Sequence, residues 1–382
     1  MLRIGIVAGE PSGDQLGAAL ITALRGRCPG VEIVAMSGPR MREAGCETVA
    51  DIEELSVMGL VEVLKHYPRL RRLQRGLIQT FLDRRPDVFV GIDVPDFVLG
   101  IEKQIKQGGI PTAHLVCPQV WAWRAHRVPA LRASVSRLLT LFPFETEFLR
   151  AHGIDATFVG HPLADRISAN IDRVAARRAL GAPSEGPLVA LMPGSRTQEY
   201  RRHLPLFLAA AAELRALEPA CNFVLGMVNE RAVRWAAEQP LVESLGVAIH
   251  GARSRDILAA SDAALCVSGT ITLEAALSQT PLVVAYRMPW LTHQILKRLV
   301  RVPHIALPNL LMDSPLVPEL IQSKATAGNL AAALASWLRE PARVQAYRAQ
   351  CAVLHQALGR DAGNAAAAAL LDLLPAALGT AP

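Results

Sequence analysis

Short apolar runs alternate with longer helix-like segments along almost the whole chain, and this alternation limits the fold more than any other feature. Strands are predicted at Leu2–Ala8, Glu32–Met36, Val88–Ile92, Thr112–Val116 and Leu138–Leu141, and again at Leu188–Met192, Phe223–Met227, Ala263–Val267 and Leu282–Tyr286. The segments between them are rich in Ala and Leu, as at Leu204–Leu217. Nearly continuous apolar strands alternating with helices predict parallel sheets that helices cover on both faces.

The length of 382 residues exceeds what one hydrophobic core usually serves, so two domains are expected. Residues 165–187 carry charges, Pro and Gly but no predicted strand, and the strand series restarts after them. We therefore predict an α/β fold with two doubly wound, Rossmann-like domains facing a central cleft, at 1–165 and 166–349. An Ala-rich helix is predicted at Gly363–Leu378, within a tail (350–382) that packs back on the first domain.

Composition narrows the class of protein only a little. Apolar residues make up 51% and charged residues 19%, and the net charge of +6 suits acidic small molecules, anionic lipid or nucleic acid alike. Neither a signal peptide nor an apolar stretch long enough to span a bilayer is recognisable. The six cysteines are scattered without a CxxC pair, which indicates reduced thiols and a cytoplasmic location.

Ligands of open parallel sheets bind beyond the carboxyl ends of strands, so the segments that follow the strands are the candidate sites. In the first half, the turn GEPSGD offers an acceptor-binding loop, or else a structural turn in which Ser12 or Asp14 caps the next helix. Its candidate ligand residues are Gly9, Glu10, Ser12, Gly13 and Asp14.

A second candidate is GIDVPDF, which places Asp93 just past a strand. A carboxylate there can accept a proton from an attacking hydroxyl, so Asp93 is the predicted general base. Asp96 is assigned to capping the next helix, with Pro95 in its first turn. A third candidate, CPQVWAWRAHR, offers either a ligand-site wall or core packing through Trp121, Trp123 and Arg124.

In the second half, the turn PGSR combines Gly194, Ser195 and Arg196 at an expected helix start, which suits a diphosphate. The segment SGTITLE offers a similar start at Gly269 and Thr270, with Glu274 one turn later to hold ribose hydroxyls. Each of these turns also reads as an ordinary capped helix. Arg287 and Asn309 are further candidates for the same cleft.

Motifs that hold a metal ion are missing from the sequence. Neither HExxH nor the DxD pair of metal-bound nucleotide sites is present, and no cofactor motif is recognised. We therefore expect no metal and no cofactor, and expect arginine and helix termini to balance the charge of a leaving diphosphate.

Residues 55–82 mix apolar and basic side chains, a pattern typical of a helix at an anionic membrane surface and also of ordinary surface helices. The predicted membrane face comprises Val57, Leu60, Val61, Leu64, Lys65, Arg69 and Arg72, and the same mixture continues with Leu70, Arg71, Leu73, Arg75 and Leu77.

Taken together, the motifs resemble those of the lipid-A-disaccharide synthase family of Gram-negative bacteria. The resemblance covers nearly the whole chain and is carried, in order, by AGEPSGD, SGPRMREAGCE, VMGLVEVL, PDVFVGIDVPDF, PQVWAWR, FPFE, FVGHPLAD, LMPGSRTQE, SGTITLE, PLVVAYR and LPNLL. It implies a GT-B fold and an inverting, metal-independent glycosyl transfer. The expected substrates are UDP-2,3-diacylglucosamine and 2,3-diacylglucosamine 1-phosphate (lipid X), and the products are UDP and a β-1,6 disaccharide.

The resemblance also assigns residues. The family's essential aspartate matches Asp93, its essential arginine matches Arg196, and its UDP contacts match Gly269, Thr270, Glu274 and Asn309. Val98 stands where the family often has asparagine, so no role of that amide carries over. The family implies work at the anionic inner face of the cytoplasmic membrane, no nucleic-acid partner, and a homodimer formed by exchange of C-terminal parts.

Three alternatives remain from the residues alone. A UDP-sugar epimerase needs no acceptor, a UDP-N-acetylglucosamine transferase of peptidoglycan synthesis uses a donor without acyl chains, and a membrane-bound nucleotide sensor forms no product.

Overall fold

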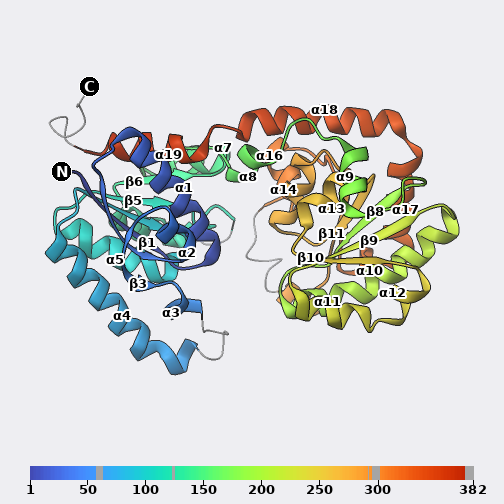
Figure 1. The fold of residues 1–382 in the computed structure, drawn as a ribbon, viewed down its shortest axis with the longest axis horizontal. Helices are drawn as coiled ribbons and strands as arrows, with labels where there is room; N and C mark the ends of the chain where they lie inside the picture. The colour runs from blue at the N-terminus through green and yellow to red at the C-terminus, as the bar shows by residue number, and fades with distance from the viewer. Residues whose placement is uncertain (57–62, 123–124, 291, 295–301, 375–382) are drawn as a thin grey trace. The chain divides into compact units, whose positions relative to one another are not determined.

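The computed structural model describes residues 1–56, 63–122, 125–290, 292–294 and 302–374. The chain divides into two compact units, drawn in Figure 1. Unit 1 comprises residues 1–165 and 358–382, and unit 2 comprises residues 166–357. Each unit is a parallel sheet with helices on it, so the chain has the predicted α/β, two-Rossmann GT-B fold.

Unit 1 has, within the described residues, a seven-stranded parallel sheet in the order β3-β2-β1-β4-β5-β6-β7. Its strands are β1 (Arg3–Ala8), β2 (Glu32–Ser37), β3 (Glu47–Asp51), β4 (Val88–Ile92), β5 (Thr112–Leu115), β6 (Arg137–Thr140) and β7 (Ala156–Phe158). The helices are α1 (Pro11–Arg27), α2 (Pro39–Glu43), α3 (Glu53–Ser56), α4 (Val63–Arg84), α5 (Pro95–Gln107), α6 (Val128–Ser134), α7 (Pro143–Ala151) and α19 (Ala362–Leu371), with a 3-10 turn at Ala125–Arg127; α8 (Pro162–Arg166) lies at the boundary.

Alternate residues of the central strands of unit 1 enter two separate cores. Ile4 and Ile6 of β1 pack with α1 and α19 on one face of the sheet, while Val7 packs with α4 and α5 on the other. These four helices are labelled in Figure 1. This period of two is what buries an apolar strand on both faces. Gly5 leaves room for Phe81, because a Cβ at position 5 would lie 2.9 Å from the Phe81 ring.

Unit 2 has, in the part of the chain described, a six-stranded parallel sheet in the order β10-β9-β8-β11-β12-β13. Its strands are β8 (Leu188–Met192), β9 (Asn222–Met227), β10 (Ala248–Gly251), β11 (Ala263–Cys266), β12 (Leu282–Tyr286) and β13 (Glu319–Ile321). The helices are α9 (Arg173–Leu180), α10 (Thr197–Leu217), α11 (Glu230–Ala237), α12 (Pro240–Ser244), α13 (Ser254–Ala260), α14 (Thr270–Leu277), α16 (Leu307–Met312), α17 (Ala327–Arg339) and α18 (Pro341–Leu358), with a 3-10 turn at Gln322–Lys324.

The nine predicted strands are all present, with ends within one residue of the prediction. Among the residues that the structure describes, four further strands were not predicted, namely β3, β7, β10 and β13, and these four are the edges of the two sheets. The predicted tail helix is α19, which ends at Leu371, and residues 375–378 of that prediction lie outside the described residues.

Two further findings concern the thiols and the helices of the chain. The six cysteines are free thiols, of which Cys117, Cys221, Cys266 and Cys351 are buried. Among the described residues, no helix combines the length and the apolar composition that crossing a bilayer requires.

Candidate functional site

A cavity of about 450 Å³ opens at the carboxyl edge of the unit 2 sheet. It lies beyond the ends of β8, β9 and β11, and the two turns that the sequence singled out in this half both line it. Its walls include Gly194, Ser195, Arg196, Glu199, Gly226, Ser254, Gly269, Thr270 and Glu274. The structure therefore brings the PGSR and SGTITLE segments, more than 70 residues apart, to one site.

The PGSR turn is shaped by a glycine and a carboxylate. Gly194 has φ of 115°, a conformation that side chains avoid, and a Cβ there would lie 2.8 Å from Glu199. Arg196 is the N-cap of α10, and the Glu199 carboxylate accepts a 3.4 Å hydrogen bond from its backbone N–H. The guanidinium of Arg196 lies 3.4 Å from the same carboxylate, but its side chain is 84% exposed and thus available to an anion.

The second turn leaves its backbone open. Gly269 has φ of 148° and is the N-cap of α14, and no atom lies within 4 Å of where its Cβ would be. Together with exposed Thr270, it presents the N-terminus of α14 to the cavity. Free N–H groups and the helix dipole at such a terminus favour a negatively charged ligand.

Glu274 lies one turn into α14, half-buried on the cavity wall. Burial raises the pKa of its carboxyl group, while the hydroxyl of Ser254 and the charge of Arg255 oppose that shift. Ser254 donates a 2.9 Å hydrogen bond to Oε1. This carboxyl group is suited to accept hydrogen bonds from sugar hydroxyls.

Arg287, a third candidate in this half, is not among the residues that line the cavity. Its backbone N–H donates to Nε2 of His203, whose Nδ1 in turn donates to the carbonyl of Glu199. That arrangement needs a neutral imidazole, and burial lowers the pKa of His203 accordingly. Within the described residues the buried Nε of Arg287 has no partner.

Asn309 is buried and serves the protein itself. Both hydrogens of its amide are donated within the protein, to the carbonyl of Val317 and to Glu319, and its oxygen accepts from the N–H of Val317. The predicted contact of Asn309 with UDP therefore has no support in this geometry, which gives the residue the role of holding the 309–319 loop.

In unit 1, Asp93 follows β4 in a strained turn. Asp93 has φ of 55° and Val94 has φ of 44°, both in the left-handed region that is unusual for a branched residue such as valine. One oxygen of the half-buried Asp93 carboxylate accepts from the N–H of Val94 at 2.9 Å. Strain of this kind concentrates at functional sites, which fits the predicted base.

Asp96 has a different role from the one predicted. The N-cap of α5 is Val94, with Pro95 in the first turn as expected, so the capping assignment of Asp96 is wrong. The Asp96 carboxylate instead accepts a 2.5 Å charge-assisted hydrogen bond from Arg127.

Some residues of the GEPSGD segment are buried and support the fold, and others are exposed at the surface. Helix α1 begins at Pro11 after the N-cap Glu10, so neither Ser12 nor Asp14 caps it, contrary to prediction. Asp14 is buried, and its two oxygens accept from the backbone N–H groups of Gly38, Arg40 and Met41 at the start of α2. Its carboxylate therefore holds the start of α2, although Asp14 also lines a small cavity of unit 1.

The remaining residues of this segment lie differently. Gly9 makes room for the strained turn, since a Cβ there would lie 2.8 Å from the Val94 side chain, and Gly13 is buried in α1. Glu10 and Ser12 are exposed, and each lines a cavity of unit 1.

Trp121 belongs to a core rather than to a ligand wall. Its ring meets Phe144 edge-on, with centroids 4.7 Å apart, and its Nε1 donates to buried Glu145 at 3.1 Å. Burial raises the pKa of Glu145 to about 8. The other two candidates from this segment, Trp123 and Arg124, lie outside the described residues.

The predicted membrane face is only partly described. Val57, Leu60 and Val61 lie outside the described residues, as do the side chains of Leu64 and Lys65. Leu70, Leu73 and Leu77 of α4 pack on the unit 1 core, so these apolar side chains do not face a bilayer as expected. The basic residues Arg69, Arg71, Arg72 and Arg75 are exposed.

Between α4 and α5 lies a second cavity, of about 1370 Å³, entirely within unit 1. Leu70, Ile78 and Phe97 contribute apolar walls, and Arg71, Arg75 and Lys103 contribute positive charge. The GEPSGD turn reaches it through Gly9, Glu10 and Pro11. Such a groove suits a ligand with both apolar and anionic parts.

Comparison with known proteins decides the family. The model of the lipid-A-disaccharide synthetase family matches residues 4–372. The chain belongs to the lipid-A-disaccharide synthase family. It is 48% identical to the lipid-A-disaccharide synthase of Alkalilimnicola ehrlichii over 97% of this chain and 98% of that one. It is also 48% identical to the enzyme of that name from Pseudomonas aeruginosa, over 98% of each chain. As a member of this family, it is a glycosyltransferase.

Solved structures agree on the fold. The Neisseria meningitidis UDP-GlcNAc 2-epimerase, solved with UDP-GlcNAc bound, superposes with a TM-score of 0.66 at 13% identity and covers 97% of this chain and 100% of its own. A glycosyltransferase of kitacinnamycin superposes with the same score at 17% identity over 98% and 99%. At these identities the likeness concerns the fold alone.

Sequence reasoning missed Ser254 and Glu199, which orient Glu274 and the PGSR turn. Ser254 follows edge strand β10, which the apolar pattern did not reveal. Glu199 was detectable, because a glutamate three residues after a helix start is a capping-box signal.

Proposed function

We propose that this chain joins UDP-2,3-diacylglucosamine to 2,3-diacylglucosamine 1-phosphate, releasing UDP and forming the β-1,6-linked disaccharide with inversion at the anomeric carbon. The observation that carries the proposal is the joint lining of one unit 2 cavity by PGSR and SGTITLE in a member of this family. The substrates come from the family resemblance.

Unit 2 is the proposed UDP site. Two helix N-termini, those of α10 and α14, lie on the cavity wall, so their free N–H groups suit the two phosphates of UDP. The exposed guanidinium of Arg196 turns from Glu199 to the leaving diphosphate, and Glu274 accepts from the ribose hydroxyls. Charge is balanced by these groups, and no divalent cation takes part in the proposed reaction.

Unit 1 is the proposed source of the base. Asp93 removes the proton from the 6-hydroxyl of the acceptor as the oxygen attacks the anomeric carbon from the face opposite UDP. The hydrogen bond from Val94 fixes one carboxylate oxygen and leaves the other to accept the proton. The strained turn supports this role, because the fold holds Asp93 in a conformation that local preferences oppose.

The acyl chains of the substrates are assigned to the α4–α5 groove of unit 1. Each methylene that leaves water there contributes roughly 0.8 kcal/mol, and Arg71 and Arg75 suit the 1-phosphate of the acceptor. The exposed arginines of α4 also suit the anionic inner face of the cytoplasmic membrane, each contributing on the order of 1 kcal/mol near such a surface. A homodimer is proposed from the family resemblance alone.

The test is incubation of the purified protein with both substrates in detergent and EDTA, with mass spectrometry of the products. We expect UDP and the tetraacyl disaccharide phosphate. A 2-epimerised UDP-sugar formed without acceptor, or turnover that needs added magnesium, contradicts the proposal. Product from UDP-N-acetylglucosamine at an equal rate contradicts the assignment of the acylated donor.

A further inference from the structure

A third cavity, of about 1170 Å³, lies within unit 2 at the edge of the sheet opposite to the proposed UDP site. Gly186 and Pro187, directly before β8, line it, as does Asp262, directly before β11. The UDP cavity lies after the same two strands. Five residues of β8 separate the two edges, which is about 16 Å at roughly 3.3 Å per residue.

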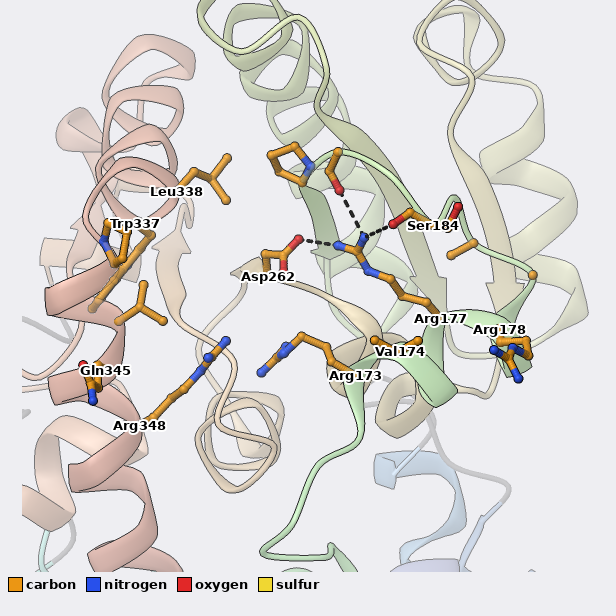
Figure 2. A pocket seen from close by; sticks show the side chains of 16 residues that line it. Arg173, Val174, Arg177, Arg178, Ser184, Asp262, Trp337, Leu338, Gln345 and Arg348 are labelled. Atoms are coloured by element: carbon orange, nitrogen blue, oxygen red, sulfur yellow. Dashed lines mark hydrogen bonds and ion pairs between the residues drawn. The ribbon is translucent and has the colours of Figure 1, made fainter.

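Charge in this cavity is unbalanced. Its charged lining residues are Arg173, Arg177, Arg178, Arg348 and one carboxylate, Asp262. Asp262 is already engaged, because it pairs with Arg177 and also accepts a 2.8 Å hydrogen bond from the N–H of Leu188. Figure 2 shows Arg177 directed at Asp262 and at the loop carbonyl of Ser184. One carboxylate, already paired with Arg177, therefore stands against four arginines in the lining of this cavity.

Two of these arginines face each other. In Figure 2 the side chain of Arg348, from α18, extends toward that of Arg173, from α9. Arg173 donates to the carbonyls of Ser261 and Gln279, which carry no charge to neutralise it. Burial, and then the positive charge of Arg348, lower the pKa of Arg173 to about 10, while the charge of Asp262 opposes part of this shift. Among the described residues, the buried Nε of Arg348 has no hydrogen-bond partner.

A like-charged, partly buried pair with an unsatisfied N–H is unfavourable unless an anion joins it. An oxyanion with several acceptor atoms and two negative charges accepts from both guanidinium groups at once and removes their repulsion. A phosphate group has both properties, whereas a simple carboxylate carries one charge. We propose that Arg173 and Arg348 form a binding site for a phosphate group, separate from the UDP site.

The site ties two distant segments of unit 2 together. Helix α9 follows the start of the unit and α18 ends it, so a bound phosphate group links its first and last helices. Val174, which is 71% exposed, and Leu338 add apolar surface beside the arginines. The source of the phosphate group is therefore either free phosphate or a lipid monophosphate.

The test measures binding of inorganic phosphate to the full chain by calorimetry, at fixed ionic strength and with UDP at saturation. We expect binding that persists in Arg196→Ala and weakens at least tenfold in Arg348→Ala. Arg231→Ala, which removes one exposed positive charge from α11, is the matched control and should leave the affinity unchanged. Arg348→Lys retains the charge and should weaken binding less, and it reports on the site if the alanine variant does not fold.

Several results overturn the proposal. Loss of phosphate binding at saturating UDP contradicts a separate phosphate site. Equal weakening in Arg231→Ala and Arg348→Ala, or binding of acetate as tight as that of phosphate, contradicts it as well. Dihexanoyl phosphatidic acid distinguishes the sources. Tighter binding than inorganic phosphate, lost in Arg348→Ala, assigns the site to a lipid monophosphate, and equal binding assigns it to free phosphate.

Discussion

Both units have turns at the carboxyl ends of parallel strands, but residues of different types occupy the positive-φ positions of these turns. After β4 of unit 1, the left-handed positions are occupied by Asp93 and Val94, which have side chains. After β8 and β11 of unit 2, the positive φ angles belong to Gly194 and Gly269. Valine in the left-handed region costs on the order of 1–3 kcal/mol, whereas glycine adopts positive φ readily.

This difference follows the chemistry proposed for each edge. Unit 1 has to aim a carboxylate, so the turn keeps a side chain and stores strain. Unit 2 has to bring backbone N–H groups close to a phosphate, so glycine, which has no side chain, occupies these turns. Under this proposal, the residue at positive φ distinguishes a turn that presents a side chain from a turn that presents backbone N–H groups.

The largest effect is expected from Asp93→Asn in unit 1. The amide retains the shape of the turn but accepts no proton, so turnover should fall by about 10²–10⁴-fold. Steady-state product formation measures this loss. Asp155→Asn, in an exposed ion pair of the same unit, is the control and should retain most activity. Near-normal turnover in Asp93→Asn would remove the functional reason for the strained turn.

A second effect concerns a carboxyl group that unit 1 buries beside Trp121. Since burial raises the pKa of Glu145 to about 8, the folded protein holds this proton to a higher pH than the unfolded chain does. Its contribution is fully present below the ordinary pKa of about 4.5, and is lost as pH rises through about 8, with a slope of up to about 1.4 kcal/mol per pH unit.

Glu145→Gln should therefore flatten the fall in stability between about pH 4.5 and 8. Thermal unfolding across this range measures the slope. Glu147→Gln, at an exposed position of the same helix, should leave the slope unchanged. Equal slopes in wild type and Glu145→Gln would show that the Glu145 carboxyl is not held protonated.

A third prediction distinguishes a stabilising role from a substrate-binding role within the GEPSGD segment. Asp14→Ala leaves three N–H groups at the start of α2 without their acceptor, so stability should fall by about 2–3 kcal/mol. Ser12→Ala, at an exposed position two residues away, should leave the melting temperature unchanged and raise the KM for the acceptor. Melting temperatures and acceptor kinetics of both variants test the division, and the reverse pattern would contradict it.

The strands and turns show how much of the fold the sequence could predict. The central strands are buried on both faces and therefore have continuous apolar sequences, which is why their ends were predicted within one residue. Edge strands such as β3 and β13 are only partly buried, so their sequences carry a weaker apolar signal. The glycine-rich turns of unit 2 were found because glycine adopts positive φ more readily than other residues do.

The partners of polar side chains could not be predicted from spacing. Asp14 contacts residues 24 to 27 positions away, and Asn309 is used by a loop whose path only the folded chain defines. Leu70, Leu73 and Leu77 had the period of a helix that buries one face, but that period does not say whether the face meets protein or lipid. The sequence therefore identified the segments that form the sites, but the role of each residue within a segment depends on tertiary packing.

The smallest effect is expected from Gly194→Ala in unit 2. A Cβ at φ of 115° is strained and would lie 2.8 Å from Glu199, so the affinity for UDP should fall about tenfold. The control is Gly246→Ala, at a positive-φ glycine with open space around it, which should lower stability slightly without changing UDP affinity. Calorimetric titration measures both, and unchanged binding in Gly194→Ala would mean that the backbone of this turn does not contact the phosphates.

The central claim is that unit 1 supplies the base and unit 2 binds the diphosphate. Titration of UDP, in EDTA, into wild type, Asp93→Asn and Arg196→Ala tests it most directly. The account predicts wild-type UDP affinity in Asp93→Asn, whose turnover is expected to fall, and affinity weakened at least tenfold in Arg196→Ala. Loss of UDP binding in Asp93→Asn, or wild-type binding in Arg196→Ala, would contradict the assignment of the base to unit 1 and the diphosphate to unit 2.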